Sequence, residues 1–386
     1  MLKKVLNIAS KKLNYPKCEC SNFLYTLVIS LAFFSVACEP CTGIKGNGTT
    51  PEEEIYYSAT PINGEMPNIY RTDAEGSYIK SVIINGIAFS SPSNNGRIAF
   101  IRKNDDGRNN LFIADYDGRN SRLIISDNDI FNVSYPVLSP NGRYIAFNAG
   151  NSRIYYYDVS AVSPTFNQIT GKLANGSVPV FSNDSKYLAF IEGDGSQVPY
   201  TLKVIDASGT DVVNVRYSKL LGNAVFPESN DISLNWSADS KQIIFTLLNS
   251  NNDEINIVDF ETGTDRVISV PNAEIGGNQA TLSPKSDFIA VSGRDGNIWL
   301  IFIATNDLRF SNITRTDGFE RNHSPKWSVD GNKIIYSSST QLDTDIFSTL
   351  ICTQLQFEVT LARVVKSFIL SSNSFKGFWN NLAKTT

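Results

Sequence analysis

The chain has 386 residues, of which 41% are hydrophobic and 19% are charged, the composition of a globular protein with room for one large domain or two smaller ones. Its formal net charge of −4 argues against nucleic-acid binding, which needs a basic face. The single histidine, His323, argues against a histidine-based metal centre, and a structural zinc site is not expected.

The first 37 residues are predicted to be a signal peptide. Five lysines precede an apolar run, Phe23 to Phe34, which is short for a membrane span and has the charge order of a secretory signal. The run ends at Ser35-Val-Ala-Cys38, which resembles the bacterial lipoprotein signal. In that family a peptidase cuts before the cysteine, and the thiol carries diacylglycerol. An uncleaved anchor or another cleavage site is the alternative.

The lipoprotein resemblance implies lipidation of Cys38 and a membrane-anchored protein of the cell envelope, with the outer membrane as the expected location. Cleavage removes five lysines and one glutamate, so the net charge of −4 becomes −8. Residues 38–54 are rich in Gly, Thr, Pro and charge, and we expect a flexible tether there. Cys41 and Cys352 are the other cysteines left after processing, and whether they pair stays open.

Residues 55–353 contain six copies of a ten-residue frame. Each copy is the end of one strand, a tight turn such as Asp330-Gly331, and the start of a second strand. The frames close at Phe100, Phe147, Phe190, Phe245, Val291 and Tyr336, at intervals of 43 to 55 residues. A period of about 40–50 residues with four short strands per unit is typical of a β-propeller.

The predicted fold is therefore an all-β propeller. Seven segments have the pattern of a third strand, from Asn68 onward to Ile346, against six turn frames. We expect seven blades, with six as the alternative, and a first blade that lacks its inner strand. Strand material from both ends of the chain would close the ring and remove the exposed edge. Residues 354–386 break the pattern and are either that closing strand or a loose tail.

The copy that shows the repeat pattern most clearly is Ser139-Pro-Asn-Gly-Arg-Tyr-Ile-Ala-Phe147. It is followed by Ile154-Tyr-Tyr-Tyr-Asp158 and then by Ile169-Thr170. This pattern resembles the TolB-type propeller repeat over roughly residues 54–353. The resemblance implies the fold and says little about function. TolB itself carries an α/β domain before its propeller, whereas a tether is expected here, so the chain is interpreted as TolB-like and not as a TolB orthologue.

Polar loops that lead into the inner strands should converge at the mouth of the central channel. The candidate ligand-binding residues in these loops are Asn132, Glu228, Asp231, Asn278, Glu320, Arg321, Asn322 and His323. The cluster Arg321, Asn322 and His323 ends a predicted loop that begins at Asp317. A rigid scaffold with variable loops suits recognition, so we expect a protein that binds an envelope protein, peptide or glycan, without nucleic acid and without a cofactor.

An enzyme is the alternative function. A prolyl-oligopeptidase relative would need Gly-x-Ser-x-Gly, which does not occur, and a lyase that binds metal through several histidines does not fit one His. A hydrolase or lyase with a carboxylate-bound Ca²⁺ in the channel stays open. Asp115-Tyr-Asp-Gly-Arg-Asn120 resembles the start of a Ca²⁺ loop but lacks the completing Glu, so we predict a hairpin turn there. No catalytic residue and no metal ligand is assigned.

Overall fold

The computed structural model describes residues 54–59, 66–73, 79–126, 132–150, 153–160, 166–168, 176–193, 200–207, 214–222, 234–247, 254–269, 279–314, 321–339 and 344–350. The chain divides into two compact units, Met1–Thr50 and Pro51–Thr386, and every described residue belongs to the second. All regular elements in these ranges are β-strands. Within them, no helix has the length and apolarity needed to cross a membrane.

The described strands form seven antiparallel sheets in chain order. The first three sheets contain β1 (Glu54–Ala59), β2 (Asn68–Asp73) and β3 (Ile79–Ile83); β4 (Gly86–Phe89), β5 (Arg97–Lys103), β6 (Asn109–Asp115) and β7 (Arg122–Ile125); and β8 (Ser134–Leu138), β9 (Tyr144–Ala149), β10 (Arg153–Asp158) and β11 (Phe166–Gln168). The fourth and fifth contain β12 (Gly176–Phe181), β13 (Tyr187–Glu192), β14 (Tyr200–Asp206) and β15 (Val215–Gly222); and β16 (Leu234–Trp236), β17 (Gln242–Leu247), β18 (Glu254–Asp259) and β19 (Thr264–Ser269). The sixth and seventh contain β20 (Ala280–Leu282), β21 (Phe288–Ser292), β22 (Ile298–Phe302) and β23 (Arg309–Asn312); and β24 (Arg321–Trp327), β25 (Lys333–Ser339) and β26 (Thr344–Leu350).

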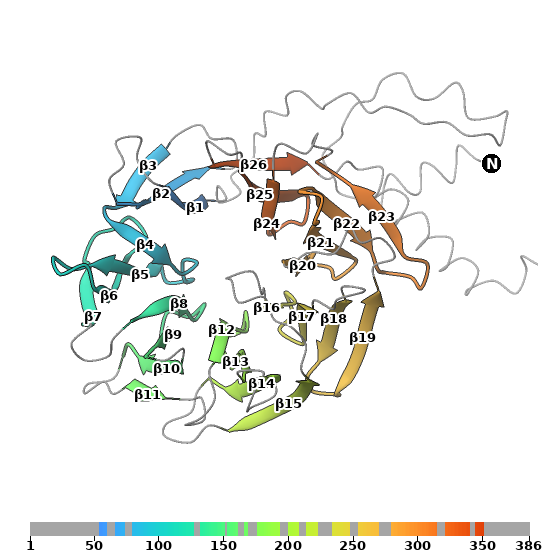
Figure 1. Cartoon of the computed structure of the whole chain (residues 1–386), viewed down its shortest axis with the longest axis horizontal. Coiled ribbons are helices and arrows are strands. Elements are labelled where there is room, and N and C mark those ends of the chain that lie inside the picture. Colours follow the sequence, from blue (N-terminus) through green and yellow to red (C-terminus); the bar gives the residue numbers. More distant parts are fainter. Residues whose placement is uncertain are drawn as a thin grey trace, which may run out of the picture. The chain divides into compact units, whose positions relative to one another are not determined.

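The sheets follow one another around a common centre (Figure 1). The first strand of each sheet from the second to the seventh lies nearest the centre, and each of these inner strands contacts the next one in the ring. This arrangement confirms the predicted all-β propeller. The number of blades in the closed ring stays a prediction, because residues 354–386, expected to close it, lie outside the described residues.

The turn chemistry of the repeated frame is confirmed. In the seventh sheet, Gly331 adopts a φ of 73°, which a side chain disfavours. Asp330 Oδ1 accepts hydrogen bonds from Ser328 Oγ at 2.7 Å and from Asn332 N at 2.9 Å. Desolvation would raise the pKa of Asp330, but the hydrogen bonds from Ser328 and Asn332 outweigh it and lower that pKa. The carboxylate thus holds the turn in the form that the sequence predicts.

Neighbouring turns are joined by hydrogen bonds, which places them on one side of the ring. Asn141 N donates to Ser185 Oγ, and Asp184 N donates to Ser240 Oγ, each at 3.0 Å. Between the second and third sheets, Asn94 N donates to Pro140 O at 2.6 Å. We call this side the turn face. Because each turn follows an inner strand, the N-terminal ends of the inner strands lie at the opposite side, the loop face.

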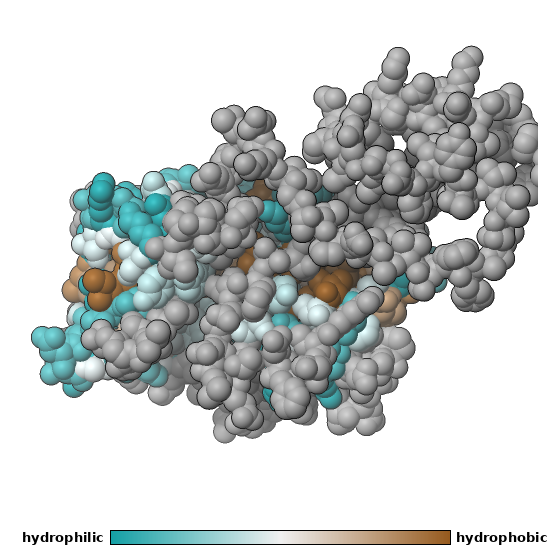
Figure 2. Space-filling model, turned by 90° about the horizontal axis from the view of Figure 1, so that it is seen from above, coloured by the Kyte–Doolittle hydropathy of each residue, from teal (hydrophilic) through white to brown (hydrophobic). Residues whose placement is uncertain are grey.

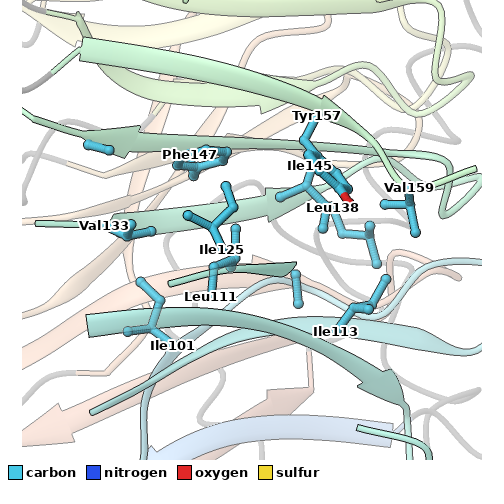
Figure 3. Close-up of a cluster of buried hydrophobic side chains, with 12 residues drawn as sticks. Ile101, Leu111, Ile113, Ile125, Val133, Leu138, Ile145, Phe147, Tyr157 and Val159 are labelled. Carbon is cyan, nitrogen blue, oxygen red and sulfur yellow. The ribbon is translucent and has the colours of Figure 1, made fainter. Parts of the chain in front are cut away.

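The hydrophobic core lies between neighbouring sheets. Figure 3 shows one shared cluster, in which Ile101, Leu111 and Ile113 of the second sheet pack against Ile145 and Phe147 of the third. Four phenylalanines of the second strands are fully buried, namely Phe100, Phe147, Phe190 and Phe245. Burying such side chains contributes about 1.5–3 kcal/mol each, so the joints between sheets supply much of the stability.

One detail of the predicted strands is corrected. Residues 321–323, predicted to end a loop, already belong to β24, where Arg321 pairs with Ser339 and Asn322 with Ser338. The strand continues past Pro325 because a bulge absorbs the missing N–H donor of proline.

Candidate functional site

The loop face contains four of the eight candidate residues. Asn132 lies two residues before the start of β8, and Arg321, Asn322 and His323 form the start of β24. The other four, Glu228, Asp231, Asn278 and Glu320, lie outside the described residues, as do Cys38, Cys41 and Cys352. The site is therefore built from the inner strands and their first residues.

The first residues of β24 have three different environments. Arg321 is exposed, and Asn322 is buried, with only 3% of its surface exposed. The backbone N and the side-chain Nδ2 of Asn322 both donate to Gly296 O, at 2.8 and 2.9 Å. Asn322 therefore fixes β24 against the β21–β22 hairpin of the preceding sheet. His323 is half-buried, and its Nδ1 lies 3.0 Å from Ser324 Oγ.

Strained backbone occurs near the starts of two inner strands, β8 and β24. Asn132, Tyr135 and Ser324 have φ values of 61°, 47° and 56°, a region that residues other than glycine rarely adopt. Tyr135 and Ser324 each precede a proline, and the strand register shifts at both places. Tyr135 is 48% exposed, and partial burial raises the pKa of its hydroxyl. Strained backbone of this kind is common at binding sites, so it supports a candidate binding site at the loop face.

One position of the inner strand has the same pairing partner in five sheets. In each of these sheets, the penultimate residue of the inner strand pairs with the penultimate residue of the ten-residue frame, which lies on the second strand. We call this set the inner ring; it consists of Val137, Val180, Asn235, Thr281 and Lys326. The backbone is thus repeated while the side chain changes from sheet to sheet.

Most members of the inner ring contact the next sheet. Val180 packs against the cluster that contains Trp236, and Trp236 Nε1 donates to Val180 O at 3.1 Å. Asn235 Nδ2 donates to Ala280 O of β20 at 2.8 Å, and Trp327 Nε1 donates to Thr281 O at 3.2 Å. These bonds hold the inner strands at fixed separations.

Lys326 departs from this pattern. Its Nζ donates to Asn235 Oδ1 at 3.0 Å, although β20 lies between β16 and β24 in the ring. The side chain must therefore reach past β20 on the side of the ring centre. Lys326 is exposed there, yet protein atoms surround the ammonium closely enough that desolvation lowers its pKa.

Sequence reasoning missed Lys326 and Asn235. Each lies directly before the tryptophan that begins its copy of the frame, so neither belongs to the repeated pattern. Alignment of the copies at this one position could have identified both residues. Val, Asn, Thr and Lys replace one another there, while the flanking residues are apolar or aromatic in the five copies of the inner ring.

The predicted hairpin at Asp115–Asn120 is confirmed. Gly118 N donates to Asp115 O at 2.8 Å, and Asn120 Nδ2 donates to Asp115 Oδ2 at 2.6 Å. These contacts are those of a turn between β6 and β7. In the part of the chain that the structure describes, no three His, Cys, Asp or Glu side chains gather closely enough to hold a metal ion.

A groove of about 420 Å³ lies on the turn face between the third and fourth sheets. Its basic side chains have acidic partners: Arg143 pairs with Asp158 at 3.0 Å, Lys186 with Asp184 at 3.1 Å, and Arg216 with Asp206 at 3.0 Å. Since each charge is already neutralised, this groove is a weaker candidate than the inner ring.

The outer surface mixes hydrophilic and apolar residues, as Figure 2 shows from above. Exposed large hydrophobic residues belong to different outer strands, for example Leu123 on β7, Leu220 on β15 and Val267 on β19. Single exposed residues of this kind are ordinary in soluble domains. The inner ring and the loop face therefore remain the best-supported candidate site.

Comparison with known proteins places these features in context. The family model of the TolB beta propeller domain matches residues 93–363. A search of the curated proteins finds no match.

Several solved structures are similar to this chain, and the two with TM-scores above 0.5 share its fold. An oligogalacturonate lyase in complex with manganese is 14% identical, with a TM-score of 0.54 over 78% of this chain and 86% of its own. The β-propeller domain of the Trilobed protease from Pyrococcus furiosus is 12% identical, with a TM-score of 0.53 over 78% and 92%. TolB from Acinetobacter baumannii is 20% identical, with a TM-score of 0.44 over 77% and 76%. At these identities the likeness concerns the fold alone.

Proposed function

The chain belongs to the TolB beta propeller domain family, and from this premise we propose that it is a lipid-anchored binding protein of the cell envelope. Its loop face takes up a protein, a peptide or a glycan, and the chain acts by binding, without a catalytic step or a cofactor. The lipid on Cys38 and the tether that follows it would hold the propeller at the outer membrane.

The observation that carries this proposal is the inner ring. Five sheets repeat the same strand pairing, but the side chain at this position is Val, Val, Asn, Thr and Lys in turn. A repeated backbone with varied side chains at the centre is what a rigid recognition scaffold needs.

The alternative, a hydrolase or lyase with Ca²⁺ in the channel, would depend on Glu228, Asp231 and Glu320. Tight stoichiometric Ca²⁺ binding in calorimetry, abolished by Glu228→Gln together with Asp231→Asn, would favour it over the binding protein.

We expect partners to be captured from the loop face. A photo-activated cross-linking residue at Asn132 or Arg321, both exposed at this face, should give specific cross-linked products in cells. The same residue at Lys241 or Lys285, exposed on the turn face, serves as the control and should give few. Equal products from both faces would contradict a loop-face partner.

Lipid anchoring is tested separately. In Cys38→Ala the acyl chains are lost, and each buried CH₂ contributes about 0.8 kcal/mol to membrane binding, so the protein should move to the soluble fraction. Cys41→Ala is the matched control and should stay with the membrane. Fractionation with immunoblotting measures both, and unchanged membrane association of Cys38→Ala would count against the anchor.

A further inference from the structure

The inner ring contains one positive charge, Lys326, that has no acidic partner among the described residues. The described inner strands β4, β8, β12, β16, β20 and β24 carry Arg321 and Lys326 but no aspartate or glutamate. Among the described residues, the ammonium of Lys326 contacts the neutral amide oxygen of Asn235 and forms no ion pair. An amide oxygen satisfies one of the three N–H donors of an ammonium, so the remaining donors are available to a ligand.

Asn235 is well placed to hold the ammonium without neutralising it. Its Nδ2 donates to Ala280 O at 2.8 Å, which fixes the amide and directs Oδ1 toward Lys326 at 3.0 Å. A long lysine side chain loses conformational entropy when it is ordered, and this contact has already ordered it. The site is thus organised before any ligand arrives.

Protein atoms around the ammonium of Lys326 desolvate it, which lowers its pKa and makes the charged form less favourable. Lys326 as a residue is nevertheless exposed, so a ligand can approach its side chain. A ligand carboxylate at this point would restore the missing charge partner in surroundings of low dielectric, where the attraction is stronger than in bulk water.

We propose that the inner ring binds the carboxylate of an acidic peptide segment, through an ion pair with Lys326 that Asn235 positions. The inference rests on the proposed binding function and specifies the chemistry of the ligand.

The mixed character of the ring favours a peptide over an acidic glycan. Val137 and Val180 lie on consecutive inner strands, β8 and β12, whereas Asn235, Thr281 and Lys326 lie on β16, β20 and β24. Tyr135, 48% exposed, adds an aromatic ring at β8. Successive side chains of an extended peptide point to opposite sides, so a carboxylate can contact Lys326 while an apolar side chain contacts Val137 or Val180. A polyuronate is polar on every side, so it would match the polar residues of the inner ring but not its two valines.

The test uses the full chain, purified in detergent, and isothermal titration calorimetry. The probes are a blocked five-residue peptide that alternates leucine and glutamate, the same peptide with glutamine for glutamate, and digalacturonate. We expect the glutamate peptide to bind with one-to-one stoichiometry, and the glutamine peptide to bind at least roughly tenfold more weakly, because the charge-assisted bond is lost.

Two variants separate the ion pair from the fold. Lys326→Met should weaken binding of the glutamate peptide by roughly tenfold or more. Asn235→Asp retains the lysine but gives it an internal counter-ion, so it should weaken binding to a similar degree. Lys241→Met removes the same charge from an exposed position on the turn face and should change the affinity less than about twofold. Thermal melting by circular dichroism checks that each variant is folded.

Every outcome is informative. Equal binding of the glutamate and glutamine peptides, or unchanged binding in folded Asn235→Asp, would overturn carboxylate recognition and leave loop-face recognition standing. Binding of digalacturonate in place of the peptide would overturn the choice of a peptide. No binding of any probe would overturn the inference, while the cross-linking from Asn132 and Arg321 decides the proposed function by itself.

Discussion

Gly118→Ala should destabilise the propeller by roughly 3–5 kcal/mol, the largest effect expected for so small a change. Gly118 has a φ of 85° in the β6–β7 hairpin. A Cβ at this residue would lie 1.9 Å from the carbonyl oxygen of Val82 and 2.9 Å from its carbonyl carbon. Val82 belongs to β3 of the neighbouring sheet, and a backbone atom cannot move aside by rotating a side chain. The first two sheets would have to separate.

Gly107→Ala is the matched control. Gly107 lies in the β5–β6 hairpin with a φ of 76°, and no atom lies within 4 Å of the position its Cβ would take. This variant carries the conformational cost of positive φ alone, about 1–2 kcal/mol. Urea unfolding followed by intrinsic fluorescence measures both variants. Equal losses of stability would mean that the approach of the two sheets at Val82 contributes nothing, contrary to the structure.

The fold could be predicted from the sequence because each copy of the frame carries its own local instructions. Asp330 and Gly331 specify a turn that needs only neighbouring residues, and the structure shows that turn. Local turn chemistry does not explain Ser185, Ser240 and Ser286. These serines adopt φ values of 63°, 61° and 55° at the turn position where other frames have glycine. At Ser185 and Ser240 the hydroxyl accepts a hydrogen bond from the adjacent turn, a contact between sheets that a single copy cannot reveal.

The candidate site was less predictable for the same reason. Asn132 and the segment from Arg321 to His323 were found because polar residues stand before inner strands, but Asn322 proved to be buried against Gly296. Lys326 and Asn235 are 91 positions apart and belong to sheets that are not neighbours. Their contact depends on the curvature of the whole ring, which no local pattern encodes.

Phe147→Ala should destabilise the protein by about 3–5 kcal/mol, the range for removing a buried aromatic side chain. Phe147 is fully buried in β9, and its ring stacks on Tyr155 with centroids 5.8 Å apart. It also belongs to the cluster that joins the third sheet to Ile101 and Leu111 of the second (Figure 3). The cavity would therefore open at a joint between two sheets, where neither sheet can close it without moving the other.

Leu220→Ala provides the control, because Leu220 is an apolar residue of the outer strand β15 with 66% of its surface exposed. Its loss should change the free energy of unfolding by about 0.5 kcal/mol or less. Urea denaturation of the two variants compares them directly, and similar shifts of the midpoint would contradict a core located between the sheets. If the joint carries the stability, Phe147→Ala should lower the midpoint of one cooperative transition, since sheets that share their core cannot unfold one at a time.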